Sequence, residues 1–214
     1  MLCSAVLFDC DGVLVDSETV SLRALDRYLA RYGKVAPPNF AYQLVGKRAV
    51  DNGRLIIETF DLPVTLEQHI KEFRQLIEIM VEAEAEAMPH ADHVLRMLHE
   101  RGIPLAVATS SPRPYLSMIL RKFGWEQLFQ ASVTGEEVQH GKPAPDIFLR
   151  AAELLNVPIE ECWVIEDAPH GVAAGVASGA RVFAIPNSVT RHLAFPDHVQ
   201  HMTNLAEVLG QLAD

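Results

Sequence analysis

The chain has little cysteine and no long hydrophobic run. Its three cysteines, Cys3, Cys10 and Cys162, are scattered through 214 residues, and such an odd, widely spaced set does not describe a disulfide framework. No apolar run approaches the length of a membrane span, and Asp9 and Asp11 interrupt the apolar start of the chain. We therefore expect a protein of the reducing cytoplasm, without a signal peptide or an anchor.

Basic residues are also scarce. The chain has 18 lysines and arginines against 28 aspartates and glutamates, which gives a formal net charge of −10. This charge repels phosphate backbones and anionic membrane surfaces, so we expect neither a nucleic acid nor a membrane as partner. A small phosphorylated metabolite would need a locally cationic site. Nothing in the sequence demands more than a monomer.

The chain does have an alternation of strand-like and helical patterns. Short apolar runs predict strands at Ala5–Phe8, Leu105–Ala108, Ala131–Val133, Cys162–Ile165 and Val182–Ile185. Helical patterns bounded by glycine or proline lie at Ala91–Arg101, Pro112–Phe123 and Asp146–Leu155. The alternation predicts an α/β fold, a Rossmann-like parallel sheet with helices on both faces. In a further short helix, Gly171, Gly175 and Gly179 have a spacing that favours close packing on this sheet.

One segment departs from this alternation. Helical periodicity without a convincing strand occurs at Glu18–Arg31, Val50–Phe60 and Glu67–Ala87. Thr65 and Gln68 have the spacing of a capping box that opens the last of these helices. We therefore expect an all-helical cap domain of residues 17–87, inserted into an α/β core of residues 1–16 and 88–214.

Two carboxylates stand at the end of the first predicted strand. Asp9 and Asp11 are two residues apart, and because successive side chains of a strand point to opposite faces, both would share one face. Gly12 marks the point where the chain turns out of the strand. On this spacing alone, a solvated polar turn is the more common interpretation, and other parts of the chain must decide.

Polar residues also follow the other predicted strands. Thr109, Ser110 and Ser111 follow the second strand, Lys142 precedes a proline-started helix, and Glu166 and Asp167 end a later strand. In open α/β sheets the carboxyl ends of the strands form the ligand crevice, so these side chains can meet Asp9 and Asp11 there. Four carboxylates with one lysine need a divalent cation to offset their repulsion, and hard oxygen ligands favour Mg²⁺. Such a site suits phosphoryl transfer.

Four motifs follow one another in the chain: Asp-x-Asp-Gly from Asp9, hydrophobic-Ala-Thr-Ser ending at Ser110, Gly-Lys-Pro-Ala-Pro-Asp ending at Asp146, and hydrophobic-Glu-Asp ending at Asp167. Their order and spacing resemble the haloacid dehalogenase superfamily, specifically its branch of β-phosphoglucomutase-like phosphatases and mutases. The resemblance covers nearly the whole chain, including a helical cap of the size that this family has between the first and second motifs.

The resemblance implies a role for each matching residue. Asp9 would be the nucleophile that becomes an aspartyl phosphate, and Asp11 the acid and base that serves the leaving group and then the attacking water. Thr109 and Lys142 would bind the transferring phosphoryl group, with Ser110 and Ser111 beside it.

The resemblance also implies a Mg²⁺ site and a substrate-binding loop. The ligands would be the Asp9 carboxylate, the Asp11 backbone carbonyl and the Asp167 carboxylate. Glu166 is either a further ligand or a neighbour of one, because adjacent residues of a strand face opposite ways. In the cap, the loop Gly46-Lys47-Arg48 resembles the mutase loop that contacts the far end of the substrate, but its basic residues follow Gly46 more closely. Lys47 and Arg48 are either contacts to that end of the substrate or solvated surface charges.

Phosphatase and mutase remain alternatives. β-Phosphoglucomutase carries a histidine in its first cap helix where this chain has Ser21, and this departure favours hydrolysis of a small organic phosphate, a sugar or sugar-acid monophosphate by family expectation. A phosphoacceptor signalling module would need neither Asp11 nor a cap, and a dehalogenase would need no Mg²⁺ acids. A non-catalytic sugar-phosphate-binding protein would require one of the site residues to be misplaced.

Overall fold

The computed structural model describes residues 3–44 and 49–212 of the chain. These residues form two compact units, one of residues 3–16 with 86–212 and one of residues 17–44 with 49–85. No helix within the described ranges has both the length and the apolar character needed to cross a bilayer.

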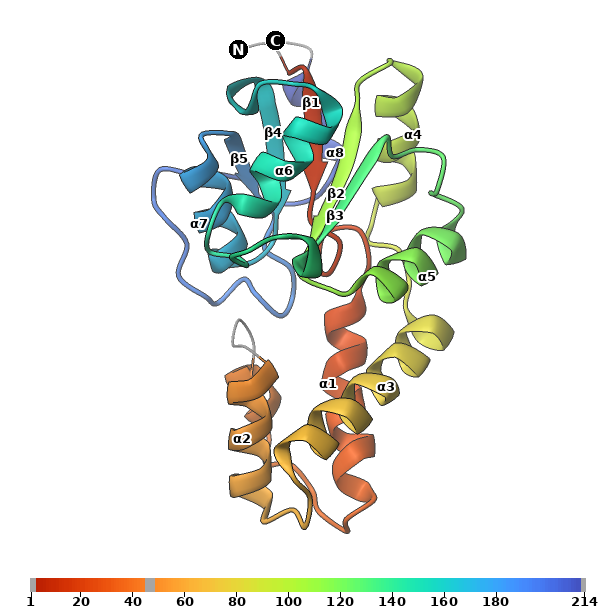
Figure 1. Ribbon diagram of the computed structural model, residues 1–214, viewed down its shortest axis with the longest axis vertical. Helices are drawn as coiled ribbons and strands as arrows, with labels where there is room; N and C mark the ends of the chain where they lie inside the picture. Colours follow the sequence, from red (N-terminus) through yellow and green to blue (C-terminus); the bar gives the residue numbers. More distant parts are fainter. Residues whose placement is uncertain (1–2, 45–48, 213–214) are drawn as a thin grey trace. The chain divides into compact units, whose positions relative to one another are not determined.

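The larger unit contains a sheet of six parallel strands (Figure 1). Its spatial order is β3 (Ala131–Thr134), β2 (Leu105–Thr109), β1 (Ala5–Phe8), β4 (Cys162–Glu166), β5 (Arg181–Ala184) and β6 (Gln200–His201). The predicted parallel sheet is therefore confirmed. The strand β6 was not predicted. It consists of two exposed polar residues at the sheet edge, which have no apolar run to indicate a strand.

Helices cover both faces of this sheet (Figure 1). They are α4 (Ala91–Glu100), α5 (Arg113–Phe123), α6 (Asp146–Leu155), α7 (Pro169–Ser178) and α8 (Ala206–Gln211), with short 3₁₀ turns at Gly135–Glu137 and Ile159–Glu161. One face of the sheet packs with α6 and α7 in a cluster that includes Leu7, Val164, Phe148 and Val172. Every residue of β1, β2 and β4 is buried, as expected for central strands of a sheet covered on both faces.

The smaller unit contains α1 (Ser17–Ala30), a 3₁₀ turn at Phe40–Leu44, α2 (Ala49–Phe60) and α3 (Leu66–Glu84), and none of its described residues forms a strand. The prediction that this segment is helical is thus confirmed for its described residues. The capping box is also confirmed, because the Gln68 N–H donates to Thr65 Oγ1 at 3.2 Å and the Thr65 N–H donates to Gln68 Oε1 at 3.0 Å.

The end of α3 differs from the prediction. Helical periodicity suggested that the helix continues to Ala87, but α3 ends at Glu84 and Ala85 is extended. Beyond it, the Glu86 carbonyl accepts a hydrogen bond from the Asp16 N–H at 3.0 Å, and Ala87 forms an antiparallel bridge with Val15. The two chain segments that leave and re-enter the larger unit thus pair with each other, and this pairing outweighs the helix preference of alanine and glutamate.

Candidate active site

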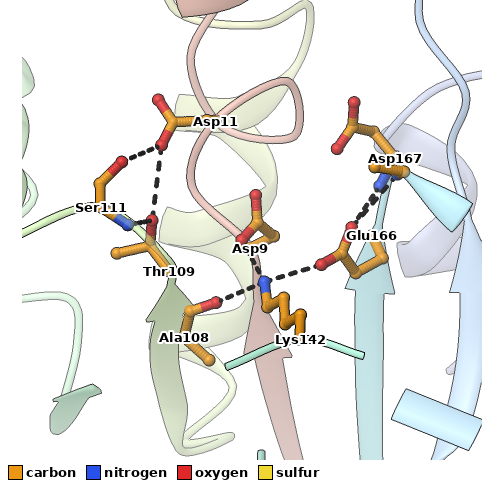
Figure 2. A network of polar contacts seen from close by, with 9 residues as sticks. Asp9, Asp11, Ala108, Thr109, Ser111, Lys142, Glu166 and Asp167 are labelled. Atoms are coloured by element: carbon orange, nitrogen blue, oxygen red, sulfur yellow. Dashed lines mark hydrogen bonds and ion pairs between the residues drawn. The ribbon is translucent and has the colours of Figure 1, made fainter. Parts of the chain in front are cut away.

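A buried lysine lies between two carboxylates at the carboxyl ends of the central strands (Figure 2). Lys142 Nζ donates to Asp9 Oδ1 at 2.5 Å, to Glu166 Oε1 at 2.7 Å and to the Ala108 carbonyl at 3.0 Å. The exposed fractions of the side chains are 2% for Lys142, 10% for Asp9 and 2% for Glu166. Asp9 follows β1, Ala108 belongs to β2 and Glu166 ends β4, so three adjacent strands converge on one ammonium group.

Burial and the ion pair between Asp9 and Lys142 have opposite effects on the pKa of each residue. Burial raises the pKa of the Asp9 carboxyl to about 8, with further increases from Glu166 and Asp11 and an opposing effect of Lys142. Burial lowers the pKa of Lys142, but the carboxylates of Asp9 and Glu166 outweigh it and raise that pKa above its ordinary value. Lys142 is therefore cationic at neutral pH.

Asp167 completes an acidic cluster with Asp9 and Glu166. Each of the three residues offers one carboxylate oxygen, these oxygens lie within 4.8 Å of one another, and all three residues are buried. One ammonium group does not balance three carboxylates, and a divalent cation would supply the missing charge. Since the donors are all hard oxygen atoms, the cluster fits Mg²⁺.

A bend after β4 allows Glu166 and Asp167 to reach the same site. Glu166 is the last residue of the strand, and its Oε2 accepts the N–H groups of Asp167 at 3.0 Å and Ala168 at 3.2 Å. These bonds turn the chain directly after the strand, so the alternation of faces no longer applies to Asp167. A Cβ atom at Gly171, in the first turn of α7, would overlap the Glu166 carboxylate. The absent side chain of Gly171 therefore makes room for that carboxylate.

Asp11 belongs to a second group of contacts. Its Oδ2 accepts hydrogen bonds from Ser111 Oγ at 2.7 Å and Thr109 Oγ1 at 3.4 Å, and its Oδ1 accepts one from the Tyr115 hydroxyl at 2.7 Å. Figure 2 shows the Asp11 carboxylate turned toward Ser111 and Thr109, whereas Asp9 faces Lys142. The Ser111 N–H also donates to Thr109 Oγ1 at 3.0 Å. The hydroxyl groups of Thr109, Ser111 and Tyr115 thus orient Asp11.

The structure brings most of the predicted site residues together. Asp9, Lys142, Glu166 and Asp167 form the buried cluster, and Asp11, Thr109 and Ser111 form the adjoining group. Ser110 is exposed. Gly46, Lys47 and Arg48 lie outside the described residues.

Sequence reasoning missed Tyr115 and Asn187. Tyr115 lies in α5, where its apolar neighbours suggest only packing. Asn187 Nδ2 donates to Asp167 Oδ2 at 2.8 Å and to the Gly12 carbonyl at 3.3 Å. Asn187 follows β5, so the rule that polar residues after parallel strands share one crevice, applied to β5 as well, would have singled it out.

Comparisons with known proteins agree with this geometry. The family model for haloacid dehalogenase-like hydrolases matches residues 3–179. The bifunctional riboflavin kinase/FMN phosphatase of Arabidopsis thaliana is 35% identical over 214 residues, all of this chain but only 54% of that relative, so the chain spans about half its length. Hexitol phosphatase A of Escherichia coli is 35% identical over 86% of this chain and 84% of its own. The crystal structure of a candidate beta-phosphoglucomutase from Thermotoga maritima has a TM-score of 0.84 and 27% identity, with 98% of both chains covered.

Proposed function

The chain belongs to the haloacid dehalogenase-like hydrolases, and on this basis we propose that it is a Mg²⁺-dependent phosphatase. The substrate would be a small organic phosphate monoester, a sugar or sugar-acid phosphate, hydrolysed through an aspartyl phosphate. The observation that carries this proposal is the buried Asp9 carboxylate, paired with Lys142 beside Glu166 and Asp167. Burial raises the pKa of Asp9, whereas the Lys142 ammonium and a cation bound at the cluster would favour the ionised carboxylate that attacks a phosphoryl group.

The reaction would proceed in two displacements. A carboxylate oxygen of Asp9 forms a bond to phosphorus while the bond to the ester oxygen breaks, and Asp11 gives that oxygen a proton. Water then attacks phosphorus, Asp11 takes a proton from it, and the bond between phosphorus and Asp9 breaks to release phosphate. Lys142 stays paired with Asp9 and contributes positive charge beside the phosphoryl oxygens.

Asp9, Glu166 and Asp167 would hold Mg²⁺, together with the Asp11 backbone carbonyl. When bound, the ion would offset the negative charge of the carboxylates and of the phosphoryl oxygens. Similarity to a hexitol phosphatase supports a sugar or polyol phosphate as substrate, and similarity to an FMN phosphatase supports the broader class of phosphate monoesters.

A mutase is the second function to test, because one structural relative is a candidate beta-phosphoglucomutase. Ser21 stands where the mutase carries a histidine, and the Ser21 hydroxyl donates to the Ser17 carbonyl of its own helix at 2.8 Å. A hydroxyl group that satisfies its own helix is a poor substitute for an acid–base imidazole. This contact favours hydrolysis.

Phosphate release from a panel of phosphorylated sugars and small acids, with Mg²⁺, tests the proposal beside a mutase assay on β-glucose 1-phosphate. We expect release from one compound far above the rest, and reversible loss of it with EDTA. Asp9→Asn should abolish turnover and the hydroxylamine-sensitive acyl phosphate, whereas Asp197→Asn, at an exposed aspartate of the same unit, should leave both unchanged. Full activity after chelation would refute the dependence on Mg²⁺. Conversion of β-glucose 1-phosphate without release of phosphate would establish a mutase.

A further inference from the structure

Asn187 connects the acidic cluster to the loop that carries Asp11. Its side-chain amide donates from Nδ2 to Asp167 Oδ2 at 2.8 Å and to the Gly12 carbonyl at 3.3 Å. Asp167 belongs to the cluster that fits a divalent cation, and Gly12 directly follows Asp11 in the chain. A single amide group therefore contacts both segments from which the proposed cation ligands come.

The other end of the same amide fixes its orientation. Asn187 Oδ1 accepts the N–H groups of Val189 at 2.8 Å and Thr190 at 3.1 Å, so the loop after β5 folds back on its own side chain. Since only an oxygen atom can accept these two bonds, the nitrogen must be the atom that faces Asp167 and Gly12. Thr190 Oγ1 accepts the Asn187 N–H at 3.1 Å and lies 3.4 Å from Asp167 Oδ2. The loop is thus built to present a donor to Asp167.

The backbone at Gly12 is packed tightly against this contact. Gly12 has a φ of +79°, a conformation that L side chains rarely adopt. A Cβ atom there would overlap the Asp167 carboxylate and would lie 2.7 Å from Asn187 Nδ2. This arrangement of the amide and the carboxylate therefore requires glycine at position 12.

We propose that Asn187 is a positioning residue that sets the affinity of the site for its divalent cation. By donating to Asp167 Oδ2 and to the Gly12 carbonyl, the amide holds the Asp167 carboxylate and the Asp11–Gly12 backbone in one mutual orientation. A carboxylate held by such a donor loses little rotational freedom when a cation binds, and removal of partners of this kind typically weakens metal binding by about 10–100-fold. This inference rests on the Mg²⁺ site of the proposed function.

Asn187→Ser removes the donor to Asp167 and keeps an acceptor for the N–H groups of its own loop. A serine hydroxyl can still accept the N–H two residues later, as in a serine turn, but it is too short to donate to Asp167. Asn204→Ser is the matched control, because Asn204 Oδ1 accepts the N–H of Ala206 at 2.9 Å in a comparable turn away from the acidic cluster. Asn187→Thr, whose methyl group fills part of the vacated space, serves if serine destabilises the loop.

Mg²⁺ binding is measured on the full chain without substrate, by calorimetry and by the Mg²⁺-dependent rise in melting temperature. We expect the Mg²⁺ dissociation constant of Asn187→Ser to be about 10–100-fold above that of the wild type, with Asn204→Ser unchanged. Excess Mg²⁺ should then restore the kcat of Asn187→Ser to within about twofold of the wild-type value. Equal Mg²⁺ affinity in wild type and Asn187→Ser would overturn the role of Asn187 and leave the proposed function intact. No Mg²⁺ binding by the wild type would overturn both.

Discussion

Gly171 lies so close to Glu166 that a Cβ atom at position 171 would overlap the Glu166 carboxylate. The neighbouring glycines of α7 have different roles. A Cβ at Gly175 would lie 2.8 Å from Val182 and 3.0 Å from Val164, which is the predicted packing on the sheet, whereas Gly179 has a φ of +89° and ends the helix. The predicted close packing on the sheet is therefore right for Gly175 and for Gly171, which lies against Glu166 of β4, and wrong for Gly179.

Gly171→Ala should disable the site while leaving the rest of the fold in place. The added methyl group would push the Glu166 carboxylate away from Lys142 and from the acidic cluster, and we expect phosphatase activity to fall about a hundredfold or more. Gly210→Ala is the matched control, because Gly210 also lies in a helix and a Cβ there would contact nothing within 4 Å. Phosphate release and melting temperature are measured for both variants. Normal activity of Gly171→Ala would show that Glu166 is not needed where the structure places it.

Tyr115→Phe should lower kcat about tenfold and leave KM unchanged. The variant keeps the buried ring but removes the hydroxyl that donates to Asp11 Oδ1 at 2.7 Å, and a hydrogen bond to a charged group contributes about 1.5–3 kcal/mol. Its loss lets the Asp11 carboxylate adopt other orientations, which slows proton transfer without weakening substrate binding. Steady-state kinetics tests this against Tyr32→Phe, which removes a hydroxyl bonded to Glu72 at 3.4 Å in the smaller unit. Equal kcat values for the two variants would exclude a role for the Tyr115 hydroxyl.

The arrangement of the central site residues follows from a topological rule. Because the carboxyl ends of parallel strands meet at one edge of a sheet, Asp9, Lys142, Glu166 and Asp167 could be expected together once the apolar runs had been recognised as strands. Tyr115 could not be found in this way, because its ring is buried in a helix like many tyrosines and only three-dimensional packing brings its hydroxyl to Asp11.

The boundaries of elements were predicted less well for a different reason. The C-terminal end of α3 and the strand β6 depend on backbone pairing with distant segments, namely Asp16 with Glu86 and β5 with β6. Local propensity contains no information about such partners. The glycines at 12 and 171 are a similar case, because the side chains that exclude a Cβ atom there come from elsewhere in the site.

Lys142→Met should abolish activity and make stability strongly dependent on Mg²⁺. The lysine side chain is 2% exposed and pairs with Asp9 and Glu166, so methionine would leave two buried carboxylates without their cation. Removing one partner of a buried ion pair costs about 3–5 kcal/mol. Since Mg²⁺ would replace part of the lost charge, it should raise the melting temperature of this variant more than that of the wild type.

Melting curves with EDTA and with Mg²⁺ test this expectation, with Lys71→Met at an exposed lysine as control. The control should behave as the wild type in both conditions. If Mg²⁺ gave Lys142→Met and the wild type the same increase in melting temperature, the acidic cluster would not be the place where the cation binds.

His69 should make the stability of the smaller unit sensitive to mild acid. The residue is 1% exposed, its ring lies 5.0 Å from that of Tyr28 and 5.5 Å from that of Phe73, and among the described residues its Nδ1 has no hydrogen-bond partner. Burial lowers the pKa of His69 below its ordinary value, with Glu72 acting weakly in the other direction. The folded protein therefore favours the neutral ring.

The sign of the pH effect follows from this shift. Between the ordinary pKa of about 6.5 and the lower pKa of the folded state, the unfolded chain binds a proton that the folded chain does not, so stability falls as pH decreases through this window. His69→Phe keeps the ring contacts and removes the titration. Urea unfolding at pH 7.5 and 5.5 should show a larger loss of stability for the wild type than for His69→Phe, while His93→Phe, at an exposed histidine, follows the wild type. Equal losses in wild type and His69→Phe would mean that His69 is protonated in the folded state without cost.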